Sequence, residues 1–345
     1  MKVAFLDRDG TLIWEPPDTK QIDAVEKLQI LPGVFEGLER LQQDGYSLVM
    51  VSNQNGVGTP AFPTNAFEQP QVEFLRQLKE RGITFSRIFI CPHLPEENCM
   101  CRKPKTGLVD QYLNENPIDL TASVMVGDRE TDLQCALNIG VPFVSMRTNS
   151  CFPRFTLQRR TTRETDVSVL VNLDGTGRAA ITTGIGFLDH MLELLTKHAL
   201  IDLTLSVLGD LQIDEHHTVE DTALTLGAAI AEALGDKRGI ERYGFLLPMD
   251  EALAEVAIDL SGRPYFVFEG DFKREYVGEL PTELVPHFFE SFAQALKCNL
   301  HMTIRRGKNE HHKVEALFKG LGRCLRQAIR QSPYETGIPS TKGSL

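Results

Sequence analysis

A short string of metal-ligand residues occurs twice in this chain, and it constrains the fold more than any other feature. His216-His217-x-x-Glu220 returns as His311-His312-x-x-Glu315, and Leu226-Gly227 returns as Leu321-Gly322 with the same spacing. Histidine is scarce, with 9 residues in 345. A repeated tetrad in a repeated context indicates a duplicated half-domain whose copies each carry metal ligands.

The repeat extends toward the N-terminus. His190-x-x-Glu193 is matched by His287-x-x-Glu290, and Glu164 is matched by Glu251. These pairs supply further imidazole and carboxylate groups to each copy. Such a ligand set suits Mn²⁺, Fe²⁺ or Zn²⁺.

The spacing within the tetrad predicts how the ligands are shared. Apolar residues at helical spacing predict helices over Thr218–Leu234 and Val314–Ile329, after a group of strands in each copy. His216 and Glu220 then share a helix face, whereas His217 points about 100° away. Each tetrad is therefore expected to supply ligands to two metal sites, and no single helix supplies all the ligands of one site. One tetrad alone would also fit a capped helix start.

Composition narrows the class of protein. The net charge of −11 argues against nucleic-acid and acidic-membrane partners. The sequence has neither an apolar run long enough for a spanning helix nor the apolar core of a signal peptide. Seven cysteines, three of them within 91–101, resemble metal ligands in a reducing cytoplasm more than a disulfide framework.

The first half alternates apolar runs with helical patterns. Strands are predicted at 3–6, 46–51, 85–91, 123–126 and 141–146, and a helix at 34–43. Polar residues follow several of these strands. This pattern predicts a doubly wound α/β domain with its site above the sheet. Asp7 and Asp9 lie two positions apart at a strand end. One carboxylate can act as a nucleophile or bind a cation while the other transfers protons.

These strand-end residues resemble the four ordered motifs of the haloacid-dehalogenase-like phosphatases. The resemblance covers about residues 1–150 and implies a Mg²⁺-dependent phosphomonoesterase. It implies Asp7 as phosphoryl-accepting nucleophile, Asp9 as general acid/base, Ser52 and Asn53 on phosphate oxygens, Lys103 over the phosphate, and Asp7, Asp9 and Asp128 at the Mg²⁺, with Asp132 in the same fourth motif.

One loop of this half has the composition of a structural zinc site. Cys91, His93, Cys99 and Cys101 offer three thiols and an imidazole, in a loop with two prolines and no apolar periodicity. The alternative is a set of free buried cysteines beside an unrelated histidine. Within the phosphatase family the loop resembles that of histidinol-phosphate and heptose-bisphosphate phosphatases.

A boundary is predicted where the patterning changes. Residues 148–153 read as a short linker, and an alternating strand follows at 166–173. We therefore expect a phosphatase domain at 1–155 and an internally duplicated α+β domain at 156–345, with pseudo-repeats of about 156–245 and 246–345.

The second domain resembles imidazoleglycerol-phosphate dehydratase over its whole length. The resemblance is carried by Arg-x-Thr161-x-x-Glu164-Thr, Gly186-Phe-Leu-Asp-His190-Met, Asp214-Glu-His-His-Thr-Val-Glu-Asp221, Ser261-Gly-Arg-Pro264 and His311-His-Lys-Val-Glu-Ala316. It implies two Mn²⁺ ions per site and a 24-subunit shell in which ligands of neighbouring subunits meet. One ion would take His216, Glu220, His287 and His312, and the other His190, His217, His311 and Glu315.

The remaining roles follow from the same resemblance and from the chemistry. A carboxylate must move the C–H proton, with Glu164 the first candidate and Glu193 the second; the sequence does not decide between them. The substrate phosphate needs cations and hydroxyls, for which the candidates are Arg242, Arg263, Lys319, Ser340 and Lys342.

Together the halves resemble the bifunctional enzymes of histidine biosynthesis that join a histidinol-phosphatase to an imidazoleglycerol-phosphate dehydratase. This resemblance implies small phosphate esters as substrates, L-histidinol phosphate for the first half and D-erythro-imidazoleglycerol phosphate for the second. Two alternatives remain: a phosphatase-like half kept as a scaffold, and a metal-storage shell built from the histidine-rich half.

Overall fold

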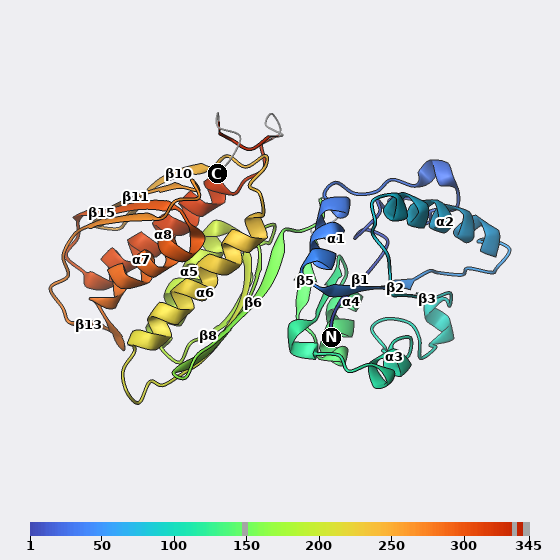
Figure 1. Cartoon of the computed structure of the whole chain (residues 1–345), viewed down its shortest axis with the longest axis horizontal. Helices are drawn as coiled ribbons and strands as arrows, with labels where there is room; N and C mark the ends of the chain where they lie inside the picture. Colours follow the sequence, from blue (N-terminus) through green and yellow to red (C-terminus); the bar gives the residue numbers. More distant parts are fainter. Residues whose placement is uncertain (147–150, 333–336, 341–345) are drawn as a thin grey trace. The chain divides into compact units, whose positions relative to one another are not determined.

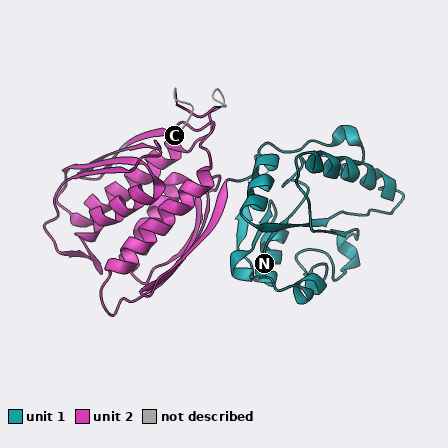
Figure 2. Ribbon diagram, viewed as in Figure 1, with its two compact units in different colours: residues 1–153 teal, residues 154–345 magenta. Residues whose placement is uncertain are grey.

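The chain folds into two compact units. In the computed structural model, residues 1–146, 151–332 and 337–340 are described, and the units comprise Met1–Pro153 and Arg154–Leu345 (Figure 2). Residues 148–150 of the predicted linker lie outside the described residues. In the described part of the chain no helix combines the length and the apolar character needed to cross a bilayer.

The first unit is built on a five-stranded parallel sheet with helices on both faces (Figure 1). Its strand order is β3-β2-β1-β4-β5. The strands are β1 (Lys2–Leu6), β2 (Tyr46–Asn53), β3 (Arg87–Cys91), β4 (Val124–Gly127) and β5 (Phe143–Ser145), and the helices are α1 (Val34–Gln43), α2 (Thr64–Glu80), α3 (Asp110–Glu115) and α4 (Glu130–Ile139).

This architecture confirms the predicted doubly wound domain. Each predicted strand is present, with ends displaced by one or two residues. The central strands are buried along their length because α3 and α4 cover one face and further helices the other. Asp7, Asn53 and Asp128 lie at or just beyond the carboxyl ends of the adjacent strands β1, β2 and β4, so parallel pairing brings them to one edge of the sheet.

The second unit places four helices between two four-stranded sheets (Figure 1). The first sheet has the order β6-β7-β9-β8 and the second the order β10-β11-β15-β12. The first half contains β6 (Phe155–Thr161), β7 (Thr165–Asn172), β8 (Ala179–Thr182), α5 (Gly186–Ala199), β9 (Asp202–Gly209) and α6 (His216–Leu234). The second contains β10 (Tyr243–Met249), β11 (Ala252–Asp259), β12 (Tyr265–Glu269), the short β13 (Tyr276–Val277) and β14 (Leu280–Pro281), α7 (Leu284–Leu296), β15 (Asn299–Arg306) and α8 (Glu310–Ala328).

The two halves of this unit share one topology. Each has three strands, a helix, a fourth strand that inserts between the second and third, and a final helix, with the two-stranded β13-β14 added in the second half. The pair β8-β9 is parallel, and so is its counterpart β12-β15. One expectation was incomplete: each half holds two helices, because α5 and α7 precede the fourth strand.

The repeated glycines lie where helices cross between the halves. α6 packs on α7, and α8 packs on α5. A Cβ atom added to Gly227 would meet the carbonyl oxygen of Phe292 at 2.7 Å, and one added to Gly322 would meet that of Leu195 at 2.7 Å. The repeat therefore preserves glycine because both crossings bring backbones into contact.

Candidate active sites and metal centres

Polar side chains line a small pocket above the sheet of the first unit. The lining residues are Asp7, Asp9, Ser52, Asn53, Lys103, Arg129, Thr131 and Asp132. Five of these eight were predicted site residues, and Asp132 was expected with them. Arg129 and Thr131 were not, because no pattern distinguishes them from other residues at a helix start.

Lys103 is the buried cation of this pocket. Its Nζ lies 2.6 Å from Asp7 Oδ1 and 2.6 Å from Asp132 Oδ1, and its side chain is 2% exposed. Burial by itself lowers the pKa of Lys103, but the two carboxylates outweigh burial and hold that pKa above its ordinary value. The group is therefore a permanent cation beside the nucleophile candidate, where a phosphate dianion would need one.

Three carboxylates gather beside it. Asp7, Asp128 and Asp132 have ligand oxygens within 4.8 Å of one another, and such oxygen ligands fit Mg²⁺. Burial, followed by the charge of Asp7, raises the pKa of Asp128 to about 7. A divalent cation bound here would offset both the burial and the charge of Asp7, and so would favour the ionised carboxylate. Asp9, predicted as a ligand with Asp7 and Asp128, is not in this group.

Asp9 is bonded elsewhere, by two residues that motif reasoning missed. Arg8 Nη1 donates to Asp9 Oδ1 at 2.6 Å, and Gln54 Nε2 donates to Asp9 Oδ2 at 2.6 Å. Gln54 Nε2 also lies 2.9 Å from Ser52 Oγ. Arg8 and Gln54 are buried. The only sequence signal for them is adjacency, since each is next to a motif residue.

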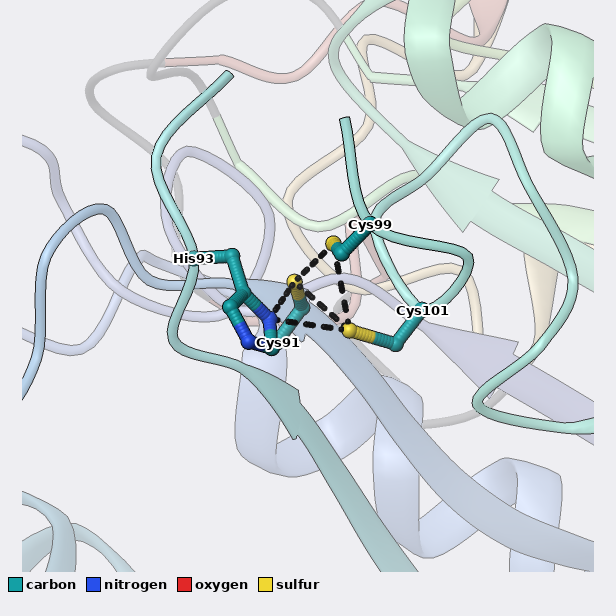
Figure 3. Close-up of side chains that lie close together, drawn as sticks. All are labelled: Cys91, His93, Cys99 and Cys101. Carbon is teal, nitrogen blue, oxygen red and sulfur yellow. Dashed lines mark hydrogen bonds between the residues drawn. The ribbon is translucent and has the colours of Figure 1, made fainter. Parts of the chain in front are cut away.

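The cysteine-rich loop brings its four predicted ligands together (Figure 3). The Cys91 and Cys101 sulfurs are 3.2 Å apart, and His93 Nδ1 lies 3.1 Å from Cys101 Sγ. Three thiols and an imidazole converging on one point are the donor set of a structural zinc site. Burial raises the pKa of the Cys91 thiol to about 12.

This loop continues directly into the phosphatase pocket. Asn53 Nδ2 donates to the carbonyl of Lys103 at 3.1 Å, and the amide of Lys103 donates to Asn53 Oδ1 at 3.0 Å. Arg102 donates to Asn55 Oδ1 at 2.7 Å and to the carbonyl of His93 at 3.1 Å. The segment 102–103 thus links the thiol cluster to the backbone that positions Lys103.

In the second unit, the ligands predicted for one ion form an incomplete cluster. His216, Glu220 and His287 have ligand atoms within 4.8 Å of one another. The buried Nε2 of His287 has no hydrogen-bond partner among the described residues, although Glu220 Oε1 lies 3.8 Å away. An unpartnered imidazole nitrogen beside a carboxylate fits a metal ligand. His312, the predicted fourth ligand, is not in this group.

A second, looser group combines a histidine from the first half of this unit with a histidine and a glutamate from the second half. Its ligand atoms are not all within 4.8 Å of one another, unlike those of the first group. The ring centroids of His190 and His311 are 6.2 Å apart, and His311 Nε2 lies 3.6 Å from Glu315 Oε2. These three residues are the repeat counterparts of His287, His216 and Glu220. His217, the fourth ligand predicted for this ion, hydrogen-bonds elsewhere.

His217 and His312 are each held by a carboxylate. His217 Nδ1 lies 3.1 Å from Asp210 Oδ2, and His312 Nδ1 lies 2.7 Å from Glu251 Oε2. These hydrogen bonds are the main reason that the pKa of each histidine is raised. The bond to His312 also lowers the pKa of Glu251 to about 2.

The predicted proton-transfer candidates differ in their surroundings. Glu164 is exposed, and its carboxylate makes no hydrogen bond among the described residues, while its charge acts on His217. Glu193 is also exposed and lies 4.0 Å from His190 Nδ1.

The predicted phosphate ligands are not gathered into one group in the chain. Arg242 is bonded to Asp259 at 2.5 and 3.0 Å and to the carbonyl of Pro339 at 3.0 Å. Lys319 Nζ lies 2.6 Å from Glu315 Oε1, beside the second cluster. Arg263 is exposed and Ser340 half-buried, and Lys342 lies outside the described residues.

Comparisons with known proteins agree with both halves. A family model for imidazoleglycerol-phosphate dehydratase matches residues 183–325, and one described as HAD-hydrolase-like matches residues 100–168. The histidine biosynthesis bifunctional protein HisB of Stenotrophomonas maltophilia (strain R551-3) is 49% identical over 358 residues, covering 99% of this chain and 99% of its own. The protein of the same name from Legionella pneumophila (strain Lens) is 47% identical, covering 100% and 99%.

Among solved structures, imidazoleglycerol-phosphate dehydratase from Staphylococcus aureus subsp. aureus N315 is 36% identical, covering 52% of this chain and 99% of its own, with a TM-score of 0.47. The chain is an enzyme that combines a phosphatase of the HAD-like class with a dehydratase, a carbon–oxygen lyase; both classes are generally metal-dependent. It belongs to the family of bifunctional histidine-biosynthesis proteins.

Proposed function

We propose that residues 1–155 hydrolyse L-histidinol phosphate and that residues 156–345 dehydrate D-erythro-imidazoleglycerol phosphate to imidazole-acetol phosphate. The observation that carries the first assignment is the contact of Asp7 with buried Lys103. The second rests on the three-ligand cluster of His216, Glu220 and His287 and on the looser group formed by its repeat counterparts. A phosphatase-like scaffold would not need the first arrangement, and a storage shell would not need an unbonded Glu164.

In the phosphatase, Asp7 is the nucleophile. Its carboxylate oxygen bonds to phosphorus, the ester oxygen leaves, and Asp9 protonates that oxygen as histidinol departs. Asp9 then takes a proton from the water that hydrolyses the aspartyl-phosphate. Lys103, Ser52 and Asn53 bind the phosphate oxygens. Bound Mg²⁺, held by Asp7 and Asp128 with Asp132 beside them, supplies charge neutralisation.

In the dehydratase, the chain must remove a hydrogen and a hydroxyl from carbons attached to an imidazole. Bound Mn²⁺ supplies Lewis acidity toward that ring. Glu164, which is exposed and unbonded, moves the C–H proton, and Glu193 is the alternative. Arg263, Lys319 and the tail with Ser340 and Lys342 bind the phosphate, while Arg242 orders the tail through Pro339.

The two clusters suggest that each dehydratase site is shared between copies of the chain. Each cluster lacks one predicted ligand, and that ligand is the histidine next to a member of the other cluster. A site that takes His216, His217, Glu220 and His287 from one copy and His190, His311, His312 and Glu315 from another completes both ion sets. This requirement supports a homo-oligomer, which family resemblance extends to 24 subunits.

The cysteine loop is proposed to hold Zn²⁺ through Cys91, His93, Cys99 and Cys101, which keeps the segment before Lys103 folded. Thiolate ligands need a reducing compartment, so we place the enzyme in the cytoplasm.

Two variants of the full chain test the assignment. Asp7→Asn should abolish histidinol-phosphate hydrolysis and leave dehydration unchanged, because it removes the nucleophile and Asp7 belongs to the phosphatase site alone. His217→Ala should abolish dehydration and leave hydrolysis unchanged. Both activities are measured on each purified variant. Loss of both activities in either folded variant would contradict two independent sites.

A further inference from the structure

The two histidines outside the ligand clusters are oriented by carboxylates from different places in the fold. Asp210 follows β9 and lies 3.2 and 3.1 Å from His217 Nδ1 through its two oxygens. Glu251 lies between β10 and β11 and is 2.7 Å from His312 Nδ1. Since a carboxylate only accepts hydrogen bonds, each contact places the ring proton on Nδ1. Nε2 is then the nitrogen with a free lone pair, which is the form that binds metal.

The duplication shows that these two carboxylates are not counterparts. Glu251 corresponds to Glu164 in the repeat, and no hydrogen bond joins Glu164 to His217 among the described residues. The fourth strands are in equivalent register, because Asp202 pairs with Asn172 and Asn299 pairs with Asp259.

A register shift between Leu253 and Ala254 gives β15 one extra residue, so Gly307 corresponds to Gly209. An added Cβ would meet Thr165 and Thr218 at Gly209, and it would meet Ala252 and Lys313 at Gly307. Asp210 therefore corresponds to Lys308. Lys308 ends in an ammonium group, which only donates hydrogen bonds and so cannot accept one from a histidine ring. The second half thus cannot orient its histidine from the end of the fourth strand, and it uses the repeated glutamate instead. The first half orients its histidine from that strand end, and its repeated glutamate has no bonded partner.

We propose that Asp210 and Glu251 are positioning residues that fix His217 and His312 in the metal-binding tautomer. In this arrangement Asp210 performs in the first half the role that Glu251 performs in the second, and Glu164 is thereby free to transfer the substrate proton. The inference rests on the proposed metal ligands and favours Glu164 over Glu193. A carboxylate that transfers the substrate proton must not be hydrogen-bonded to a histidine. Glu164 meets this condition because Asp210, and not Glu164, is bonded to His217.

The substitution Glu251→Gln is a sharp test because of the other bonds of this side chain. Glu251 Oε1 accepts from the amides of Asn309 at 2.9 Å and Lys308 at 3.3 Å. A glutamine keeps its oxygen there and turns its amide NH₂ toward His312 Nδ1. That nitrogen must then accept, so the ring proton moves to Nε2 and blocks the ligand position. Asp210→Ala removes the acceptor for His217, the only bond of that carboxylate among the described residues.

The experiment titrates Mn²⁺ into each metal-free full-length variant and measures free Mn²⁺ by electron paramagnetic resonance. Wild type should bind two ions per chain in the dehydratase sites. Asp210→Ala and Glu251→Gln should each weaken one of the two by about 10- to 100-fold. Excess Mn²⁺ should restore their turnover. Glu164→Gln should bind both ions normally and stay inactive at any Mn²⁺ concentration.

Glu255→Gln is the matched control, because Glu255 is an exposed carboxylate on β11 that pairs only with Arg305 in the described part of the chain. It should bind both ions as wild type does. Normal Mn²⁺ affinity in Asp210→Ala and Glu251→Gln would overturn the inference while leaving the proposed function intact. A wild type that binds no Mn²⁺ in these sites would instead contradict the proposed function. Turnover by Glu164→Gln would reassign proton transfer to Glu193.

Discussion

Gln54 shows how a single buried amide can matter to the phosphatase chemistry. It bonds Asp9 at 2.6 Å and Ser52 Oγ at 2.9 Å, so it connects the general acid/base to a phosphate ligand. In Gln54→Leu, Asp9 keeps only its bond to Arg8 and can rotate. We expect the kcat of the phosphatase to fall by roughly 10- to 100-fold, with a smaller effect on KM. Steady-state kinetics on histidinol phosphate measure this change.

The dehydratase activity of the same polypeptide serves as an internal control and should not change. Gln111→Leu removes an exposed amide that bonds Glu115 only, among the described residues, and should leave both activities at wild-type values. An unaltered kcat in Gln54→Leu would show that Arg8 alone suffices to hold Asp9.

The same residues show what motifs can predict at this scale. The strand-end positions of Asp7, Ser52, Asn53 and Asp128 follow from apolar runs that end in polar residues, whereas Lys103 lies in a loop and was assigned through the resemblance to the phosphatase motifs. The orientation of Asp9 cannot be predicted in this way, because it depends on which neighbouring side chains donate hydrogen bonds to it. Arg8 and Gln54 occupy positions that many residue types could fill, so only coordinates distinguish them.

At the scale of elements, the loop 91–101 has little apolar packing of its own to define its fold. Cys99→Ser removes one of four converging ligands and should release the zinc. Because Lys103 follows the loop and is bonded through its backbone to Asn53, we expect phosphatase activity to fall strongly. Zinc content by elemental analysis and both activities are measured on the full chain. Cys135→Ser, at a buried thiol outside the loop, should retain its zinc.

Zinc binding to this loop should also depend on pH. Burial raises the pKa of Cys91 to about 12 and also raises that of Cys101, so in the metal-free loop these thiols hold their protons at neutral pH. Zinc binds thiolates, and each thiolate formed releases a proton. The affinity should therefore fall as pH falls, by about tenfold per pH unit for each proton displaced. Chelator competition between pH 6 and 8 measures it; a flat profile would contradict thiol ligation.

At the helix crossings of the dehydratase unit, helix propensity and packing predict opposite effects of replacing a glycine by alanine. Helix propensity favours Gly322→Ala by about 1 kcal/mol. Packing opposes it, because the new Cβ would lie 2.7 Å from the carbonyl oxygen of Leu195. We expect packing to dominate and the variant to lose about 1–3 kcal/mol of stability, seen as a lower Tm. Gly337→Ala, with no atom within 4 Å, is the control. A higher Tm for Gly322→Ala would show that the helices can separate.

Elements also differ in how well the sequence predicts them. The long helices α6 and α8 have clear apolar periodicity, and all the predicted strands of the first sheet are present. α5 and α7 were not predicted, although each carries a repeated His-x-x-Glu string. In α7 the buried residues Leu284, Phe288, Phe292 and Leu296 recur at helical spacing, so the sequence carried a signal for this helix that the prediction did not use.

For the whole molecule, the proposed dehydratase site needs ligands from more than one copy of the chain. The sequence predicted that neighbouring histidines bind different metal ions. Within one chain, the predicted fourth ligands, His312 and His217, are not grouped with the other three ligands of their ions. Which copy supplies that ligand depends on an interface between chains. The proposed sharing therefore has to be tested with mixtures of subunits.

Complementation between inactive variants provides that test. His216→Ala breaks the cluster of His216, Glu220 and His287, and His311→Ala breaks the group of His190, His311 and Glu315. Each variant alone should be inactive as a dehydratase, because every proposed site combines one of these ligand groups from one copy with the other group from a second copy. When the two variants are co-expressed and assemble at random, about a quarter of the sites should combine two intact ligand groups and regain dehydratase activity. Phosphatase activity, which each chain carries whole, measures the amount of folded protein in every sample. If each chain built its own dehydratase site, no mixture would recover activity.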